Sequence, residues 1–238
     1  MLTIVNYGMG NLRSVEKAFG SLGVPTKLTS DPEEVEKATA LVVPGVGAFG
    51  QAMQNLREGG LIPVIRAAAE KGKPILGICL GMQILFETGE ESPGVQGLGI
   101  LAGTAPRLPD SKVSSADPGR FPGTIFSEER GLASSAPSGT LERIKIPHVG
   151  WNQIRLLAPD PLFEGISDGT FFYFVHSYIV RPADPTLVKA VCRYGSDFPA
   201  ILRSDDVVAC QFHPEKSGAA GLILLRNLIQ IFKLNRGG

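Results

Sequence analysis

Cysteine is scarce in this sequence, and the spacing of the few cysteines excludes two kinds of protein. The 238 residues contain three of them, Cys79, Cys192 and Cys210, with no C-x-x-C pair. Their number is odd and they are widely spaced, which suggests neither a disulfide framework nor a thiolate metal site. No histidine–carboxylate spacing suggests a catalytic metal, so we expect no metal and no cofactor. Free thiols and the lack of a basic leader before the apolar N-terminal stretch favour the cytoplasm.

The chain also lacks an excess of charge of one sign and a long apolar run. Lys and Arg together number 23, and Asp and Glu also number 23, which argues against bulk attraction to nucleic acid or to an anionic membrane. The longest apolar candidate, residues 221–234, is interrupted by Arg226, Asn227 and Lys233, well short of the ~20 residues that span a bilayer. No P-loop or dinucleotide fingerprint stands at a strand–helix junction. We expect neither nucleic acid nor membrane as a partner.

The first half of the sequence alternates apolar strands with amphipathic helices. Strands are predicted at residues 2–7, 25–30, 40–45 and 74–79, and helices at residues 11–22, 31–38, 48–56, 61–71 and 80–87. Asp31 is a good helix cap, with Pro32 at the first helical position. Four βα repeats predict an α/β fold, a doubly wound and mostly parallel sheet with flanking helices.

The second half begins with a stretch that has no regular period. Residues 106–140 hold five Pro, four Gly and seven Ser, which predicts an insertion at about residues 109–140, either a surface loop or a segment that orders on a partner. Beyond it, strands are predicted at residues 171–178, 187–195 and 200–215, with a hairpin turn at Ser204 to Asp206. An amphipathic helix at residues 218–234 ends the chain. We therefore expect one domain, residues 1–238, with C-terminal antiparallel strands.

The string Gly77-Ile-Cys79-Leu-Gly81 stands where an apolar strand ends and a helix begins. So tight a turn strains the backbone of its central residue and leaves no room for side chains on either side, which is the pattern of a nucleophile elbow. A helix N-terminus favours the thiolate, and the Leu80 amide can point at a developing oxyanion. A buried structural cysteine is the alternative, and it fits Cys192 and Cys210 better because neither has flanking glycines.

A base for the thiol is available in His213-Pro-Glu215, which follows another apolar strand. The carboxylate can hold one ring nitrogen so that the other faces the sulfur, as in a triad. The glycine-rich turn Pro44-Gly-Val-Gly47 follows the third strand, and in a doubly wound sheet its amides lie beside the elbow as a second oxyanion donor. Alone, the first string is weak evidence, because a solvated turn also explains it, and the second is equally well explained as a plain strand–helix turn.

Together these three strings resemble the class I (triad) glutamine amidotransferases. Four longer strings are similar to one group in that class, the glutaminase subunits of imidazole glycerol phosphate synthase: residues 6–11, 44–49, 147–152 and 174–178. Anthranilate and aminodeoxychorismate synthase subunits usually carry Pro-Gly-Pro-Gly in place of Pro44-Gly-Val-Gly47. The resemblance covers nearly the whole chain except about residues 108–141, and it implies a flavodoxin-like fold.

The resemblance also implies a division of labour. This chain would hydrolyse glutamine to glutamate and ammonia. A separate (β/α)₈-barrel cyclase would use that ammonia on a phosphoribulosyl formimino ribotide in histidine biosynthesis, giving imidazole glycerol phosphate and an aminoimidazole carboxamide ribotide. Because a barrel alone needs ~250 residues, the cyclase must be another polypeptide, and we expect a heterodimer.

The resemblance assigns roles residue by residue. Cys79 would be the nucleophile, His213 the base and then acid, and Glu215 the residue that orients the ring. The oxyanion would be bound by backbone amides near Val46, Gly47 and Leu80. The substrate glutamine would contact Gly45, Gln83, Glu91, Ser177 and Tyr178. The residues in contact with the cyclase would be His148, Trp151, Asn152, Tyr173, His176 and Lys216.

Three other readings stay open at this point. A glutaminase subunit of an anthranilate or aminodeoxychorismate type synthase would co-purify with a different acceptor enzyme. A regulatory module that has lost catalysis would have a broken triad, whereas all three members are present. A cysteine hydrolase or peptidase with the same elbow would be active without any partner.

Overall fold

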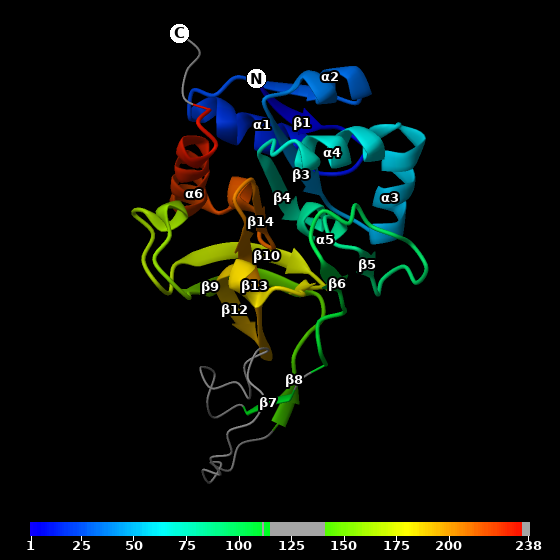
Figure 1. Ribbon diagram of the computed structural model, residues 1–238. Coiled ribbons are helices and arrows are strands. Elements are labelled where there is room, and N and C mark those ends of the chain that lie inside the picture. The colour runs from blue at the N-terminus through cyan, green and yellow to red at the C-terminus, as the bar shows by residue number, and fades with distance from the viewer. Residues whose placement is uncertain (111, 115–140, 235–238) are drawn as a thin grey trace.

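The computed structural model describes residues 1–110, 112–114 and 141–234 (Figure 1). Its first half alternates strands and helices as the sequence predicts: β1 (Leu2–Val5), α1 (Leu12–Ser21), β2 (Thr26–Thr29), α2 (Pro32–Lys37), β3 (Ala40–Gly45), α3 (Phe49–Glu58), α4 (Leu61–Glu70), β4 (Ile75–Cys79) and α5 (Leu80–Ile84). Asp31 caps α2, because its carboxylate accepts a 2.9 Å hydrogen bond from the Glu33 amide. The four βα repeats and the helix cap are confirmed.

The second half is mostly strands and short 3₁₀ turns: β5 (Thr88–Gly89), β6 (Gly103–Ala105), β7 (Lys112–Ser114), β8 (Leu141–Arg143), β9 (His148–Leu156), η1 (Pro161–Phe163), β10 (Phe171–His176), β11 (Arg181–Pro182), η2 (Pro185–Leu187), β12 (Val188–Tyr194), β13 (Ser196–Arg203), β14 (Val207–Cys210), η3 (Pro214–Lys216) and α6 (Gly218–Ile231). The hairpin between β13 and β14 and the final helix are confirmed. Strand β9 was not predicted, because polar residues and Gly150 stand between its apolar residues and leave no continuous apolar run. The insertion expected at about residues 109–140 lies mostly outside the described residues.

One mixed sheet of nine strands organises the molecule, in the order β10-β9-β12-β13-β14-β4-β3-β1-β2. Strands β2, β1, β3, β4 and β14 run parallel to one another. From β14 outward, β13, β12, β9 and β10 pair antiparallel. The α/β fold with a parallel sheet and C-terminal antiparallel strands is therefore confirmed.

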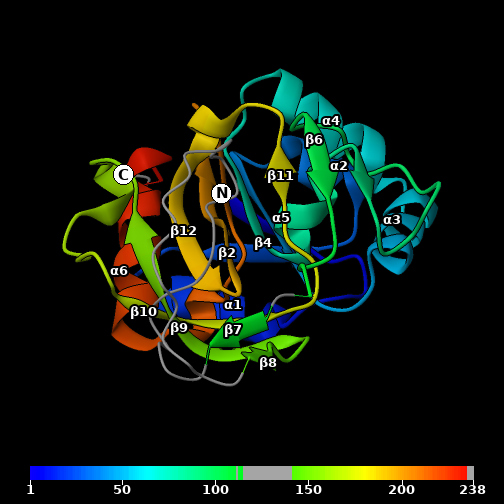
Figure 2. The same ribbon diagram turned by 90° about the horizontal axis from the view of Figure 1, so that it is seen from below.

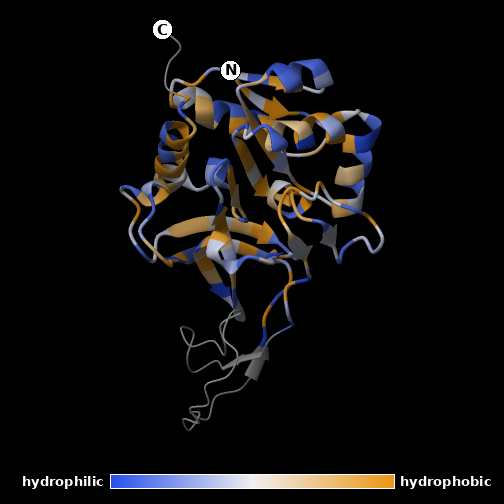
Figure 3. Cartoon of the chain, in the orientation of Figure 1, coloured by the Kyte–Doolittle hydropathy of each residue, from blue (hydrophilic) through white to orange (hydrophobic). Residues whose placement is uncertain are grey.

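Alternate residues of the parallel strands supply two separate cores. Ile4 and Val42 pack with α1 and α6 on one face of the sheet, whereas Val5 and Val43 pack with α3 and α4 on the other. The two groups of helices lie on opposite sides of the sheet (Figure 2), and apolar residues gather between the layers (Figure 3). None of the helices in the described part of the chain is long and apolar enough to cross a membrane.

The carboxyl ends of the parallel strands meet at one edge of the sheet. Gly45 at the end of β3 is the register partner of Cys79 at the end of β4. Strand β14 lies on the other side of β4, and the chain leaves it toward His213. Ligands of open α/β sheets bind at this edge, so the topology places the three predicted strings side by side.

Candidate active site

Cys79 occupies a strained turn between β4 and α5. Its backbone angles are φ 55° and ψ −111°, so it is one of two described residues other than glycine with positive φ. A Cβ at position 81 would overlap the carbonyl oxygen of Val43, and a Cβ at position 77 would lie 2.9 Å from Leu85 Cδ1. Gly81 is thus needed for the close approach of the turn to β3, and Gly77 for the close packing of β4 against Leu85 and Gly81, as the elbow pattern predicts.

His213 and Glu215 lie beside the thiol as an ordered pair. Nδ1 of His213 is 2.9 Å from Oε1 of Glu215, and the two side chains are 3% and 2% exposed. Burial lowers the pKa of the imidazole, but its hydrogen bonds with Cys79 and Glu215 and their negative charges outweigh that effect and raise the pKa to about 10. The ring therefore carries a proton at neutral pH.

The other two cysteines are placed differently. Cys192 lies inside β12 and Cys210 at the end of β14, and both are almost fully buried in the core. Burial raises the pKa of each thiol well above its ordinary value. Neither lines the cavity at the elbow, so only Cys79 combines a thiol with a base and space for a substrate.

A cavity of about 250 Å³ opens at the elbow. It brings together most of the predicted catalytic, oxyanion and substrate residues: Val46, Gly47, Cys79, Leu80, Gln83, Glu91, Ser177, Tyr178 and His213. His176 and Lys216, expected at the cyclase face, also line it, with Pro147 and Val175, which were not predicted. Gly45 lies behind this lining, where a Cβ would be 2.5 Å from the Tyr7 hydroxyl.

Buried amides and a carboxylate shape the walls of the cavity. Glu91 accepts a 2.7 Å hydrogen bond from the Phe49 amide at the start of α3. Gln83 Nε2 donates to the Tyr178 carbonyl at 3.0 Å and to Gln211 Oε1 at 3.3 Å. Gln211 Nε2 in turn lies 3.8 Å from the Cys79 sulfur. Sequence reasoning missed Gln211, although it stands two residues before His213.

The residues expected to meet the cyclase divide between the two sides of the β9–β10 ribbon. Trp151 pairs with Tyr173 on the outer side, where Trp151 is 55% exposed. The Lys216 ammonium lies 6.0 Å from the centre of the Tyr173 ring. His148 and His176 pair on the inner side and are buried, as is most of Asn152. Of the six residues, Trp151 and Lys216 are exposed and Tyr173 is half-buried.

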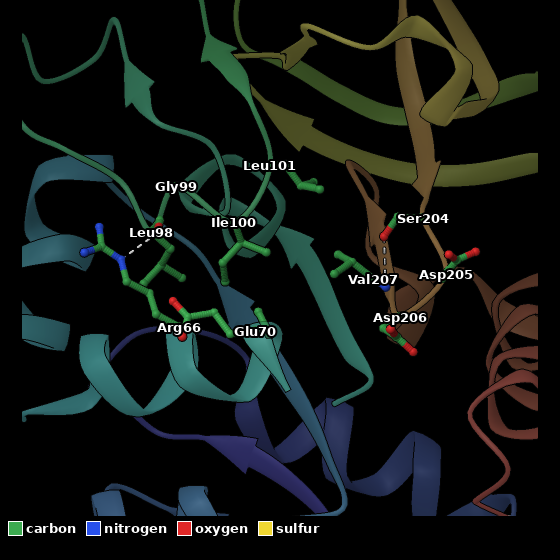
Figure 4. Close-up of a pocket in the computed structure, with 11 residues that line it drawn as sticks. Arg66, Glu70, Leu98, Gly99, Ile100, Leu101, Ser204, Asp205, Asp206 and Val207 are labelled. Carbon is green, nitrogen blue, oxygen red and sulfur yellow. Dashed lines mark hydrogen bonds between the residues drawn. The ribbon is translucent and has the colours of Figure 1, made fainter. Parts of the chain in front are cut away.

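A second, larger cavity of about 600 Å³ lies elsewhere (Figure 4). It is lined by the end of α4, the segment Leu98 to Leu101 and the turn from Ser204 to Asp206. This turn precedes β14, so the cavity is near the amino ends of the parallel strands, away from Cys79. Its lining contains no cysteine or histidine. Within the described residues, no group of three or more His, Cys, Asp or Glu side chains is arranged to hold a metal ion.

The fold and the Cys–His–Glu arrangement define a class of protein, and comparison with known proteins agrees. The family model of class-I glutamine amidotransferases matches residues 3–230, and the chain belongs to that family. More particularly, it is 45% identical to the imidazole glycerol phosphate synthase subunit HisH of Geobacillus kaustophilus, over 97% of both chains. It is 41% identical to HisH of Moorella thermoacetica, over 98% of this chain and 95% of that one. The resemblance seen in the sequence is confirmed.

Solved structures support the same fold at lower identity. A crystal structure of a glutamine amidotransferase superposes with a TM-score of 0.67 at 21% identity, over 98% of each chain. The PurLQS structure from Thermotoga maritima gives a TM-score of 0.64 at 18% identity, over 96% of each chain. These two structures show that the chain has the class-I amidotransferase fold, and the HisH relatives and the family model show that it is an enzyme.

Proposed function

We propose that this chain hydrolyses glutamine to glutamate and ammonia and passes the ammonia to a separate (β/α)₈-barrel cyclase. That subunit makes imidazole glycerol phosphate and aminoimidazole carboxamide ribotide in histidine biosynthesis. The observation that carries the proposal is the strained Cys79 beside the His213–Glu215 pair, in a cavity of the size of an amino acid. The relatives are named as HisH subunits of imidazole glycerol phosphate synthase, and they support the assignment to histidine biosynthesis.

In the first half-reaction the Cys79 thiolate attacks the carboxamide carbon of glutamine. The carbonyl π bond opens, and the negative charge moves to oxygen. The amides near Val46, Gly47 and Leu80 are the donors proposed for this oxyanion. The intermediate collapses to a thioester as the C–N bond breaks, and the His213 imidazolium gives its proton to the leaving nitrogen, which departs as ammonia.

In the second half-reaction water hydrolyses the thioester. Neutral His213 accepts a proton from the attacking water, and the hydroxide adds to the acyl carbon. Collapse of this second oxyanion intermediate releases glutamate and returns the thiolate beside an imidazolium. Glu215 keeps the ring oriented through both steps and stabilises its charge, because its carboxylate faces Nδ1.

The proposed partner face is the outer side of the β9–β10 ribbon, formed by Val149, Trp151, Phe171, Tyr173 and Val175. Val149, Trp151, Phe171 and Val175 are 58%, 55%, 51% and 37% exposed, which is unusual for apolar side chains that lie so close together. Val175 and Lys216 also line the cavity. A partner bound here covers the apolar face and meets the mouth of the site, where ammonia leaves.

Subunits of other synthases are the second candidate. The HisH relatives at 41–45% identity favour the imidazole-forming enzyme over the anthranilate type. The three free cysteines fit a reducing compartment, and we place the chain in the cytoplasm.

The direct test is glutamine hydrolysis by the full chain with the barrel cyclase and its ribotide. We expect Cys79→Ala to abolish glutamate production, whereas Cys192→Ala retains it. A glutamine-mimicking electrophile should add one adduct, located on Cys79 by mass spectrometry. An adduct on Cys192 or Cys210, or full activity of Cys79→Ala, would refute the proposal.

A further inference from the structure

Two histidines form a buried pair beneath the proposed glutamine site. His148 on β9 and His176 on β10 are register partners, with Nδ1 of His148 3.0 Å from Nε2 of His176. They are 3% and 5% exposed and pack among Phe174, Tyr194 and Phe198. The triad mechanism uses neither ring.

The hydrogen-bond partners of Asn152 fix where the proton of His148 sits. Asn152 Oδ1 accepts from the Gln153 amide at 2.8 Å, and Nδ2 donates to the Arg193 carbonyl at 3.1 Å. These two contacts set the orientation of the side-chain amide, so its second N–H points at Nε2 of His148, 3.2 Å away. Nε2 of His148 is therefore an acceptor, and its proton is on Nδ1.

The hydrogen bonds continue from His148 through His176 to the wall of the cavity. Nδ1–H of His148 donates to Nε2 of His176, so the proton of His176 is also on Nδ1. That N–H donates to the Tyr178 carbonyl at 2.9 Å. The same carbonyl accepts from Gln83 Nε2, which also donates to Gln211 Oε1. Gln211 then presents its N–H, rather than its carbonyl, to the Cys79 sulfur.

We propose that His148 and His176 are positioning residues for glutamine hydrolysis. Held as neutral Nδ1–H tautomers, they fix the Tyr178 carbonyl and, through it, the orientation of the Gln83 and Gln211 amides toward the nucleophile. This inference rests on the proposed function and adds to it a polar chain that runs from strand β9 to the sulfur.

The surroundings of the pair keep both rings neutral. Burial lowers the pKa of His148 to about 4. Burial, and then the positive charge of a protonated His148, lowers the pKa of His176 to about 3. A neutral ring is required, because a protonated His176 would present a donor to the donor of His148.

The tautomers of His148 and His176 can be determined by NMR in the full-length protein, without measuring turnover. The chain has three histidines, so ¹⁵N-histidine labelling gives three rings, which the spectra of His148→Asn and His176→Asn assign. We expect His148 and His176 to be neutral at pH 7 with the proton on Nδ1. A proton on Nε2 of either ring, or a charged ring, would overturn the inference. Failure of the chain to hydrolyse glutamine would instead overturn the proposed function.

A matched pair of variants tests the positioning role. His176→Asn keeps an N–H donor near the position of Nδ1, whereas His176→Gln places its amide near Nε2 and loses the donor to Tyr178. We expect the KM for glutamine to stay within about threefold in His176→Asn and to rise about tenfold in His176→Gln. Equal KM values in two variants of matched melting temperature would show that the ring only fills space.

Discussion

The hydroxyl of Tyr7 donates a 2.6 Å hydrogen bond to the carbonyl oxygen of Pro44. The phenol is buried, and burial followed by the negative charge of Cys79 raises its pKa, which keeps it a donor. The Met9 methyl group would lie 2.7 Å from a Cβ at Gly47. The 6–11 string thus packs against the loop that carries the proposed oxyanion amides and restrains its backbone.

We expect the peptide in Gly45-Val46-Gly47 to have two orientations, of which only one turns an N–H toward the oxyanion, and the bound cyclase to favour that one. Tyr7→Phe should weaken this control of glutamine hydrolysis by the cyclase. Loss of one buried hydrogen bond, about 1 kcal/mol, changes the populations of two loop orientations by about fivefold. The ratio of stimulated to lone activity should fall accordingly, measured as glutamate production with and without cyclase and ribotide analogue. Tyr194→Phe is the matched control, since its hydroxyl bonds the Lys145 carbonyl, which is not part of the loop that carries the proposed oxyanion amides. An unchanged ratio in Tyr7→Phe would contradict the restraint.

His213→Asn should lose at least tenfold more activity than Glu215→Gln. The imidazole transfers protons in both half-reactions, whereas the carboxylate orients the ring and stabilises its charge. Steady-state kcat values of the two purified variants decide this. Equal losses would give Glu215 a larger role than orientation.

The pH dependence follows from the raised pKa of His213. Below its value of about 10 the ring holds the proton that the leaving ammonia takes, so activity should fall as the pH rises toward 10. Cys79→Ala removes the thiolate that raises this pKa, so the pKa of His213 should fall in the variant. NMR titration of the ring measures both values, and an identical pKa in the two proteins would refute the thiolate–imidazolium pair.

Trp151→Glu should weaken binding to the cyclase by at least tenfold. It places a charge in the middle of the outer side of the β9–β10 ribbon, where a central aromatic side chain contributes most to binding. Leu157→Glu is the control, because Leu157 is also an exposed apolar residue, 43% exposed, but lies beyond the end of β9. Calorimetric titration with the cyclase measures the affinity of each variant. Similar affinities for both variants would show that the interface lies elsewhere.

The parallel half of the fold and the triad could be predicted from the sequence because their signals are local. The strand before Cys79 is continuously apolar, and the glycines on either side of Cys79 indicate that backbone segments approach closely there. By contrast, β9 carries Val149 and Trp151 on its exposed side and His148 and Asn152 on its packed side, so its pattern does not indicate a buried apolar face. The roles of Gln211 and Tyr7 depend on contacts across 132 and 37 residues of sequence, which no local pattern records.

The most direct test follows nitrogen from glutamine to product. The full chain is mixed with the barrel cyclase, its ribotide substrate and glutamine labelled with ¹⁵N in the carboxamide, in a buffer containing unlabelled ammonium. The account predicts that ¹⁵N appears in the imidazole ring of imidazole glycerol phosphate, undiluted by the ammonium, and that Cys79→Ala removes it. Imidazole glycerol phosphate that carries only unlabelled nitrogen, with ¹⁵N released to the solvent, would contradict the account.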